Sequence, residues 1–312
     1  MNSRRHFVRS SAGVAAGVVA GAGSQARGEA VADDQAAPPY LLVHGAWHTS
    51  LCWGNLSARL ASAGRRVFAI DLPGAGLHAK FPKSYLTQDK LALETEVSPL
   101  KGTGLKENTD AVVAQIRAMA GRGKVILVGH SYGGCTITRA AEQVPELIQR
   151  VVYLTAFVPV QRPALLDYAA LPEGAKGKTL ATKIGDSNIS GAVRINNRNP
   201  DPAYIENCRI AFYNDVPMDR FLPFAASLVP DVPLQGFLDD GRGTAARWGT
   251  VPRSYIRCTL DQAIPIELQD RMVVEADAFT PNNRFDQHTL ASSHSPFASM
   301  PDALAALLLS LS

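Results

Sequence analysis

The feature that most constrains this chain is the stretch LVGHSYGGC, residues 127–135, where a short apolar segment stops at a serine flanked by glycines. The apolar run at 124–128 predicts a buried β-strand, and residues 132–144 predict the helix that follows it. Glycines on both sides of Ser131 would relieve crowding at a sharp turn between strand and helix. The stretch therefore indicates either a turn that presents a nucleophilic serine or an ordinary glycine turn.

Short apolar segments alternate with amphipathic ones along most of the chain, which predicts α/β architecture with a mostly parallel central sheet and helices on both faces. Thr109 is the expected N-cap of one of these helices. Strands are expected at 40–43, 65–70, 124–128, 151–157, 254–258 and 285–290, and helices at 51–63, 108–120, 132–144 and 301–311.

The alternation is interrupted between Pro159 and Pro252 by a stretch rich in proline and aromatic residues. This stretch is too long for a bare loop, so we expect a cap inserted over the carboxyl edge of the sheet. The expected domains are a core made of 33–159 and 252–312, and a cap insertion at 160–251.

The first 32 residues have the composition of a targeting segment. The sequence SRRHFVRS precedes a mild stretch of alanine, glycine and valine, and an Ala-Val-Ala ends at Ala32. This order is typical of a signal peptide, and its S-R-R-x-F pattern is similar to a twin-arginine signal. We expect a bacterial protein that is exported to the periplasm or secreted, and that is soluble, without a stable membrane anchor, after cleavage. The alternative is a disordered basic tail.

Composition narrows the function classes. Apolar residues make up 46% of the 312 residues and charged residues 19%, as in globular proteins with a large core. Residues 1–32 carry the whole net charge of +3, so the neutral remainder offers no basic surface for nucleic acid. The four cysteines form no CxxC pair and are expected to be mostly free thiols; they are Cys52, Cys135, Cys208 and Cys258.

No cofactor or metal is expected. The stretch GAGLHA, residues 74–79, mimics a dinucleotide-binding fingerprint, but KFPKSY follows it where that fingerprint requires a helix. We interpret it as a turn. Clustered His, Asp and Glu side chains with metal-ligand spacing are not evident in the sequence.

A nucleophilic serine requires a base, and the base requires an orienting acid. Asp261 follows the strand in SYIRCTLDQAIP, and His294 follows the strand in LASSHSPF. Both come after Ser131 in the order expected for this architecture, at strand ends that meet at one edge of a parallel sheet. Taken singly, the aspartate could be a turn acid and the histidine a surface or core residue. The rival base is His288, and the rival acids are Asp239, Asp240 and Asp286.

The chemistry also requires two donors for the oxyanion. The backbone N–H of Tyr132, next to the serine, is one candidate. The loop HGAWH, residues 44–48, provides the other, for which we choose the N–H of Ala46. His44 and His48 are interpreted as residues that order this loop.

Together these residues resemble the α/β-hydrolase superfamily, in particular the branch of plant methylesterases, salicylate-binding esterases and hydroxynitrile lyases. The motifs that carry the resemblance, in order, are LLVHGAWH, DLPGAG, LVGHSYGG, VYLTAFVP, AFYNDVP, RWGTVPRSYIRCTLDQAIP and SSHSPF. The resemblance implies the α/β-hydrolase fold, a Ser131–His294–Asp261 triad, an oxyanion hole at Ala46 and Tyr132, and a cap that forms a largely apolar pocket.

The lyases of this branch carry a threonine after the first histidine of the loop and a lysine after the catalytic histidine. This chain has Gly45 and Ser295 there. Without the lysine, departing cyanide lacks its stabiliser, which favours a serine esterase acting on small, aromatic or methyl esters through an acyl-enzyme. The alternatives are hydroxynitrile lyase-type cleavage and a ligand-binding protein of low turnover on the same fold.

Overall fold

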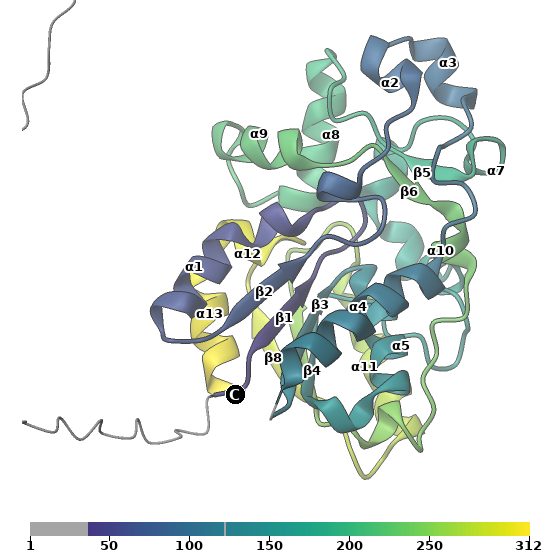
Figure 1. Ribbon diagram of the computed structural model, residues 1–312. Coiled ribbons are helices and arrows are strands. Elements are labelled where there is room, and N and C mark those ends of the chain that lie inside the picture. The colour runs from purple at the N-terminus through teal and green to yellow at the C-terminus, as the bar shows by residue number, and fades with distance from the viewer. Residues whose placement is uncertain (1–36, 122) are drawn as a thin grey trace, which may run out of the picture. The chain divides into compact units, whose positions relative to one another are not determined.

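The computed structural model describes residues 37–121 and 123–312, which form one compact unit from Ala37 to Ser312 (Figure 1). The predicted signal peptide, residues 1–32, lies outside the described residues.

A six-stranded sheet forms the centre of this unit, and every neighbouring pair of its strands is parallel. The two strands nearest the nucleophile turn are buried along their whole length, as expected for strands covered on both faces. The α/β fold with a mostly parallel sheet is therefore confirmed. In spatial order the strands are β2 (Val67–Ile70), β1 (Tyr40–Val43), β3 (Val125–His130), β4 (Ile148–Leu154), β7 (Arg253–Cys258) and β8 (Asp286–Leu290).

Helices cover both faces of the sheet. On one side α1 (Gly54–Ser62) packs with α13 (Pro301–Ser310), and on the other α4 (Leu105–Ala120) packs with α5 (Gly133–Gln143) (Figure 1). A further helix, α11 (Ile266–Phe279), connects β7 to β8 and was not among the expected elements.

Thr109 is not an N-cap, which corrects the expected start of its helix. Helix α4 begins one turn earlier, after Gly104, whose N–H donates to the Glu107 carboxylate at 2.8 Å. The Asp239 carboxylate accepts from the next N–H, that of Leu105, at 2.7 Å. Thr109 instead lies inside the helix and donates its hydroxyl to the Leu105 carbonyl at 2.7 Å. The glutamate three residues after Gly104 is the local signal that the expected boundary overlooked, whereas the second capping acid, Asp239, comes from 134 residues away.

The residues between β4 and β7 form helices of 4 to 12 residues and a small antiparallel sheet. A fully buried ion pair holds that sheet: Arg194 donates to both carboxylate oxygens of Asp231, at 2.6 and 2.8 Å. The helices are α6 (Leu165–Ala169), α7 (Ser187–Ser190), α8 (Pro202–Tyr213), α9 (Met218–Ser227) and α10 (Leu234–Leu238), and the strands are β5 (Ala192–Arg194) and β6 (Asp231–Pro233). The division into a core and a cap at 160–251 stays a prediction.

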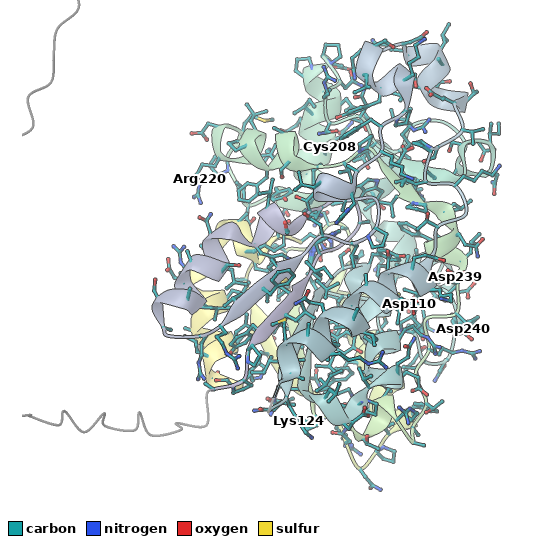
Figure 2. The ribbon with its side chains drawn as sticks, in the orientation of Figure 1. Asp110, Lys124, Cys208, Arg220, Asp239 and Asp240 are labelled. Carbon is teal, nitrogen blue, oxygen red and sulfur yellow. The ribbon has the colours of Figure 1, made fainter. Side chains whose placement is uncertain are left out.

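The four cysteines are free and buried, as the sequence suggested; Figure 2 labels one of them, Cys208, on α8. Across the described part of the chain, each helix is too short or too polar to cross a membrane.

Candidate active site

Ser131 lies on a sharp turn between β3 and α5, and its φ of 55° places it in the left-handed region that most residues avoid. A Cβ on Gly133 would come within 2.7 Å of the His44 carbonyl oxygen, and one on Gly129 within 2.5 Å of an Ile137 methyl group. Position 133 therefore requires glycine, because backbone blocks a side chain there, whereas at position 129 a side chain would displace that of Ile137. The turn is fixed by the Ser131 carbonyl, which accepts from the Gly134 N–H at 3.0 Å and from the Phe157 N–H at 3.1 Å.

His294 and Asp261 are in direct contact. The Nδ1 of His294 lies 2.6 Å from Oδ2 of Asp261, and both residues are almost fully buried. The other oxygen, Oδ1, accepts from the N–H groups of Ala263 and Ile264 at 2.6 and 2.9 Å. The contact with Asp261 favours the imidazole tautomer that carries its proton on Nδ1, which leaves Nε2 able to accept a proton.

Thr155 donates its hydroxyl to the same Oδ2 that His294 contacts. It follows β4 directly, is fully buried, and has a φ of 36°. Such a φ is unusual for a β-branched residue, and outliers of this kind occur at functional sites. Sequence reasoning missed Thr155, because the expected strand 151–157 placed it inside the sheet.

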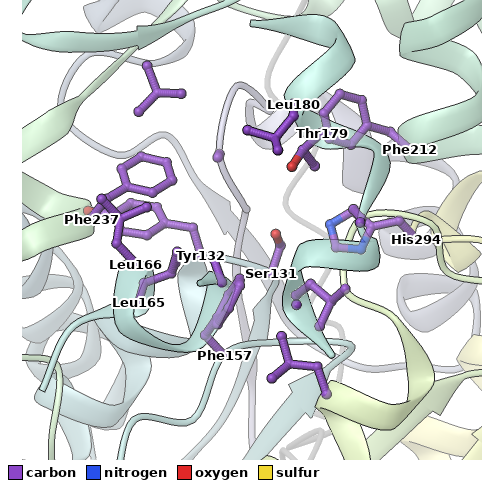
Figure 3. Close-up of a pocket in the computed structure, with 18 of the residues that line it drawn as sticks. Ser131, Tyr132, Phe157, Leu165, Leu166, Thr179, Leu180, Phe212, Phe237 and His294 are labelled. Carbon is purple, nitrogen blue, oxygen red and sulfur yellow. The ribbon is translucent and has the colours of Figure 1, made fainter. Parts of the chain in front are cut away.

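Ser131 and His294 line one cavity of about 120 Å³, and Figure 3 shows both side chains pointing into it. Among the hydrogen bonds of the described residues, none joins the serine hydroxyl to the imidazole, and such contacts often tighten only when substrate binds. The other walls are mainly apolar and aromatic. They include Trp47, Phe157, Leu165, Leu166, Leu180, Phe212 and Phe237.

Ala46 and Tyr132 line the same cavity as Ser131. Within residues 37–121 and 123–312, neither backbone N–H donates a hydrogen bond to the protein. Both donors are thus available to an oxygen atom bound beside the serine. The side chain of Tyr132 stacks on Phe237 of α10 and accepts from Asn108 at 3.0 Å, which fixes this end of the turn.

His44 and His48 order the loop after β1, as interpreted from the sequence. The Nδ1–H of His44 donates to the Gly45 carbonyl at 2.9 Å, and its Nε2 accepts from the Leu72 N–H at 3.1 Å. The ring of His48 bridges the Ala46 carbonyl at 2.9 Å and the Tyr213 hydroxyl at 2.8 Å. Burial lowers the pKa of His48 to about 3 and also lowers the pKa of His44, so both rings are neutral.

His130 is a further buried imidazole that sequence reasoning did not single out. Its Nε2 lies 2.8 Å from the His294 carbonyl, and the two ring centres are 4.5 Å apart. Burial holds the pKa of His130 well below its usual range. A neutral ring packed here fixes the backbone of His294 without adding a competing positive charge.

The rival residues are engaged elsewhere. His288 lies in the edge strand β8, 3.1 Å from Asp286, which also lies 3.6 Å from Arg150. Asp239 caps α4, and Asp240 pairs with Arg242 at 2.7 Å. Figure 2 labels both of these aspartates beside each other, at the margin of this view.

A metal site is not evident in the part of the chain that the structure describes: no three His, Cys, Asp or Glu side chains there gather as a metal would require. The GAGLHA stretch, residues 74–79, contains a 3₁₀ turn, Gly76–His78, where a dinucleotide-binding fingerprint needs the start of an α-helix.

The fold and these side chains together define an α/β hydrolase. The family described as the Alpha/beta hydrolase family matches residues 40–307, and the chain belongs to it. The suspected superfamily is therefore confirmed.

Several of the named relatives are esterases. The chain is 28% identical over 284 residues to the putative methylesterase 11 of Arabidopsis thaliana, covering 89% of this chain and 65% of that protein. It is 36% identical over 146 residues to a carbendazim-hydrolysing esterase of a Nocardioides species, covering 47% of this chain and 52% of that protein. The chain thus spans less than two thirds of either relative. A pyrethroid hydrolase from Sphingobium faniae shares the fold with a TM-score of 0.68 and 23% identity, covering 88% of this chain and 96% of that one.

Proposed function

We propose that this protein is a serine hydrolase that cleaves carboxylic esters through an acyl-enzyme. The observation that carries the proposal is the buried contact between His294 and Asp261 at the wall of the cavity that Ser131 also lines. The esterase names of the relatives support it. The mainly apolar cavity supports small, aromatic or methyl esters as substrates.

In the proposed mechanism the Ser131 hydroxyl attacks the ester carbonyl while its proton passes to Nε2 of His294. The N–H groups of Ala46 and Tyr132 donate hydrogen bonds to the oxyanion. In such sites each donor lowers the activation free energy by roughly 3 kcal/mol. The imidazolium then protonates the departing alcohol, which leaves the acyl group on Ser131. A water molecule gives its proton to the same nitrogen, attacks the acyl group and releases the acid. Asp261 fixes the imidazole tautomer and stabilises its charged form.

The position after His294 argues against lyase chemistry. Ser295 is buried there, and its hydroxyl has no hydrogen-bond partner among the described residues. A neutral side chain at this place provides no cation for a departing cyanide.

The test compares Ser131→Ala with Ser62→Ala on short p-nitrophenyl esters. Ser62 is an exposed serine of α1, so its variant controls for substitution alone. We expect Ser131→Ala to lose roughly a thousandfold or more in kcat and to lose the acyl-enzyme burst. Activity of Ser131→Ala near that of the wild type, or no hydrolysis by the wild type, would overturn the proposal.

We also propose, from the sequence, that residues 1–32 are a twin-arginine signal peptide and that the mature chain is periplasmic or secreted. The neighbouring arginines and the Ala-Val-Ala ending at Ala32 support this. Amino-terminal sequencing of the chain from the periplasmic fraction should begin at Asp33. Recovery of the uncleaved chain from the cytoplasm alone would contradict export.

A further inference from the structure

The cavity that Ser131 lines contains one lysine. Among the described residues that line it, Lys183 is the only one with an amine, guanidinium or carboxylic acid group. The other described lining residues carry no amine, guanidinium or carboxylate group. A charged group of a bound ester would therefore interact with the ammonium group of Lys183.

Among the residues that the structure describes, Lys183 has no counter-ion within ion-pair distance. The lysines that form ion pairs in the described part of the chain are Lys106, with Asp110, and Lys176, with Glu267. Lys183 is half-buried at the end of a 3₁₀ helix, Lys178–Thr182. Burial lowers the pKa of its ammonium group, the expected effect of an environment that compensates the charge poorly. A negatively charged ligand group would offset this cost.

The position of Lys183 indicates which part of a bound substrate it would contact. Together with Leu166 and Val193 it lines both the catalytic cavity and an adjoining outer hollow. The outer hollow also contains Asp186, but that carboxylate caps α7 and accepts from Asn188 at 2.8 Å. Lys183 therefore lies at the boundary between the apolar catalytic cavity and the more polar outer hollow. The far end of an extended acyl chain attached at Ser131 could reach this boundary.

We propose that Lys183 selects esters whose acyl chain ends in a carboxylate, an inference that rests on ester hydrolysis at Ser131. The apolar walls would hold the methylene chain, and the ammonium group would bind the terminal carboxylate. The substrate class is the monoester of a linear dicarboxylic acid.

The experiment uses two series of methyl esters: monomethyl esters of linear dicarboxylic acids, and methyl esters of monocarboxylic acids of the same chain lengths. Hydrolysis is followed by titration at constant pH. The quantity compared is the ratio of kcat/KM for the charged ester to kcat/KM for the neutral one. We expect a chain length at which the wild type has its highest ratio.

At that length, Lys183→Met should lower the ratio about tenfold, mainly through KM, the size of one partly buried charge-assisted hydrogen bond. Lys183→Arg should retain most of the ratio, and Lys183→Glu should lower it further. Lys178→Met, an exposed lysine outside the cavity lining, is the matched control and should keep the wild-type ratio.

Methionine keeps the apolar stem of lysine. If Lys183 only covered apolar surface, Lys183→Met would keep the wild-type ratio, and that result would overturn the inference. Loss of both ester series in Lys183→Met would overturn it as well. Failure of the esterase proposal is distinguishable, because wild-type protein would then hydrolyse neither series or Ser131→Ala would hydrolyse both.

Discussion

Substitution of Thr155 perturbs the Asp261 carboxylate without changing Asp261 itself, because the Thr155 hydroxyl donates to that carboxylate. Asp261 has four donors: Ala263 and Ile264 on Oδ1, and His294 and Thr155 on Oδ2. Thr155→Val preserves the shape and branching of the side chain but removes one donor from a buried carboxylate. A hydrogen bond to a charged group contributes about 1.5–3 kcal/mol, so we expect the free energy of unfolding to fall by about 2 kcal/mol.

We also expect an effect on catalysis. With one donor lost, the Asp261 carboxylate orients the imidazole of His294 less firmly, so kcat/KM should fall roughly tenfold.

The assay measures kcat/KM with a p-nitrophenyl ester at neutral pH, together with urea denaturation at the same pH. Thr155→Ser, which keeps the hydroxyl, is the matched control and should keep most of the wild-type kcat/KM and stability. The reasoning is refuted if Thr155→Val has wild-type kcat/KM and stability, or if Thr155→Ser loses as much of both as Thr155→Val.

Two other predictions concern the buried imidazoles and the loop beside the nucleophile. Because burial lowers the pKa of His48 to about 3, the unfolded chain binds a proton below about pH 6.5 that the folded chain does not. The free energy of unfolding should therefore fall, for this histidine, by about 1.4 kcal/mol per pH unit as pH decreases from 6.5 towards 3; equal urea midpoints at pH 7 and pH 5 would contradict this. A Cβ on Gly45 would lie 2.6 Å from Cβ of Ser131 and 2.8 Å from Nδ1 of His130, so Gly45→Ala should lower kcat roughly tenfold. Gly54→Ala, where a Cβ meets open space, is its control, and equal kcat in the two variants would show that the loop tolerates the displacement.

The sequence was informative where chain order and local pattern determine position. Residues that follow parallel strands share one edge of the sheet, so Ser131, Asp261 and His294 could be expected near one another. The structure brings Asp261 and His294 into contact, and it places His294 and Ser131 on one cavity. None of this required knowledge of side-chain packing.

The features that the sequence did not predict depend on contacts between residues far apart in the chain. Thr155 has no local signature, because a threonine in an apolar run indicates a strand and a positive φ cannot be read from it. The stretch between β4 and β7 was not predicted in detail either, since α6 and α7 have five and four residues and its small sheet depends on Arg194 and Asp231, which are 37 residues apart. Periodicity detects neither a long-range ion pair nor a helix of four or five residues.

Ser131 and Thr155, the two residues of the site with positive φ, follow neighbouring strands of the sheet. In the register of β3 and β4, His130 lies opposite Leu154, so Ser131 and Thr155 are the next residues on adjacent strands. Both leave the sheet with positive φ, at a cost of about 1–3 kcal/mol each. The backbone after this point offsets part of that cost, because the Phe157 N–H donates to the Ser131 carbonyl. Two neighbouring strand ends therefore hold the candidate nucleophile and the support of the candidate acid in one hydrogen-bonded unit. A change at Thr155 should consequently act on His294 through Asp261 while the turn at Ser131 is retained.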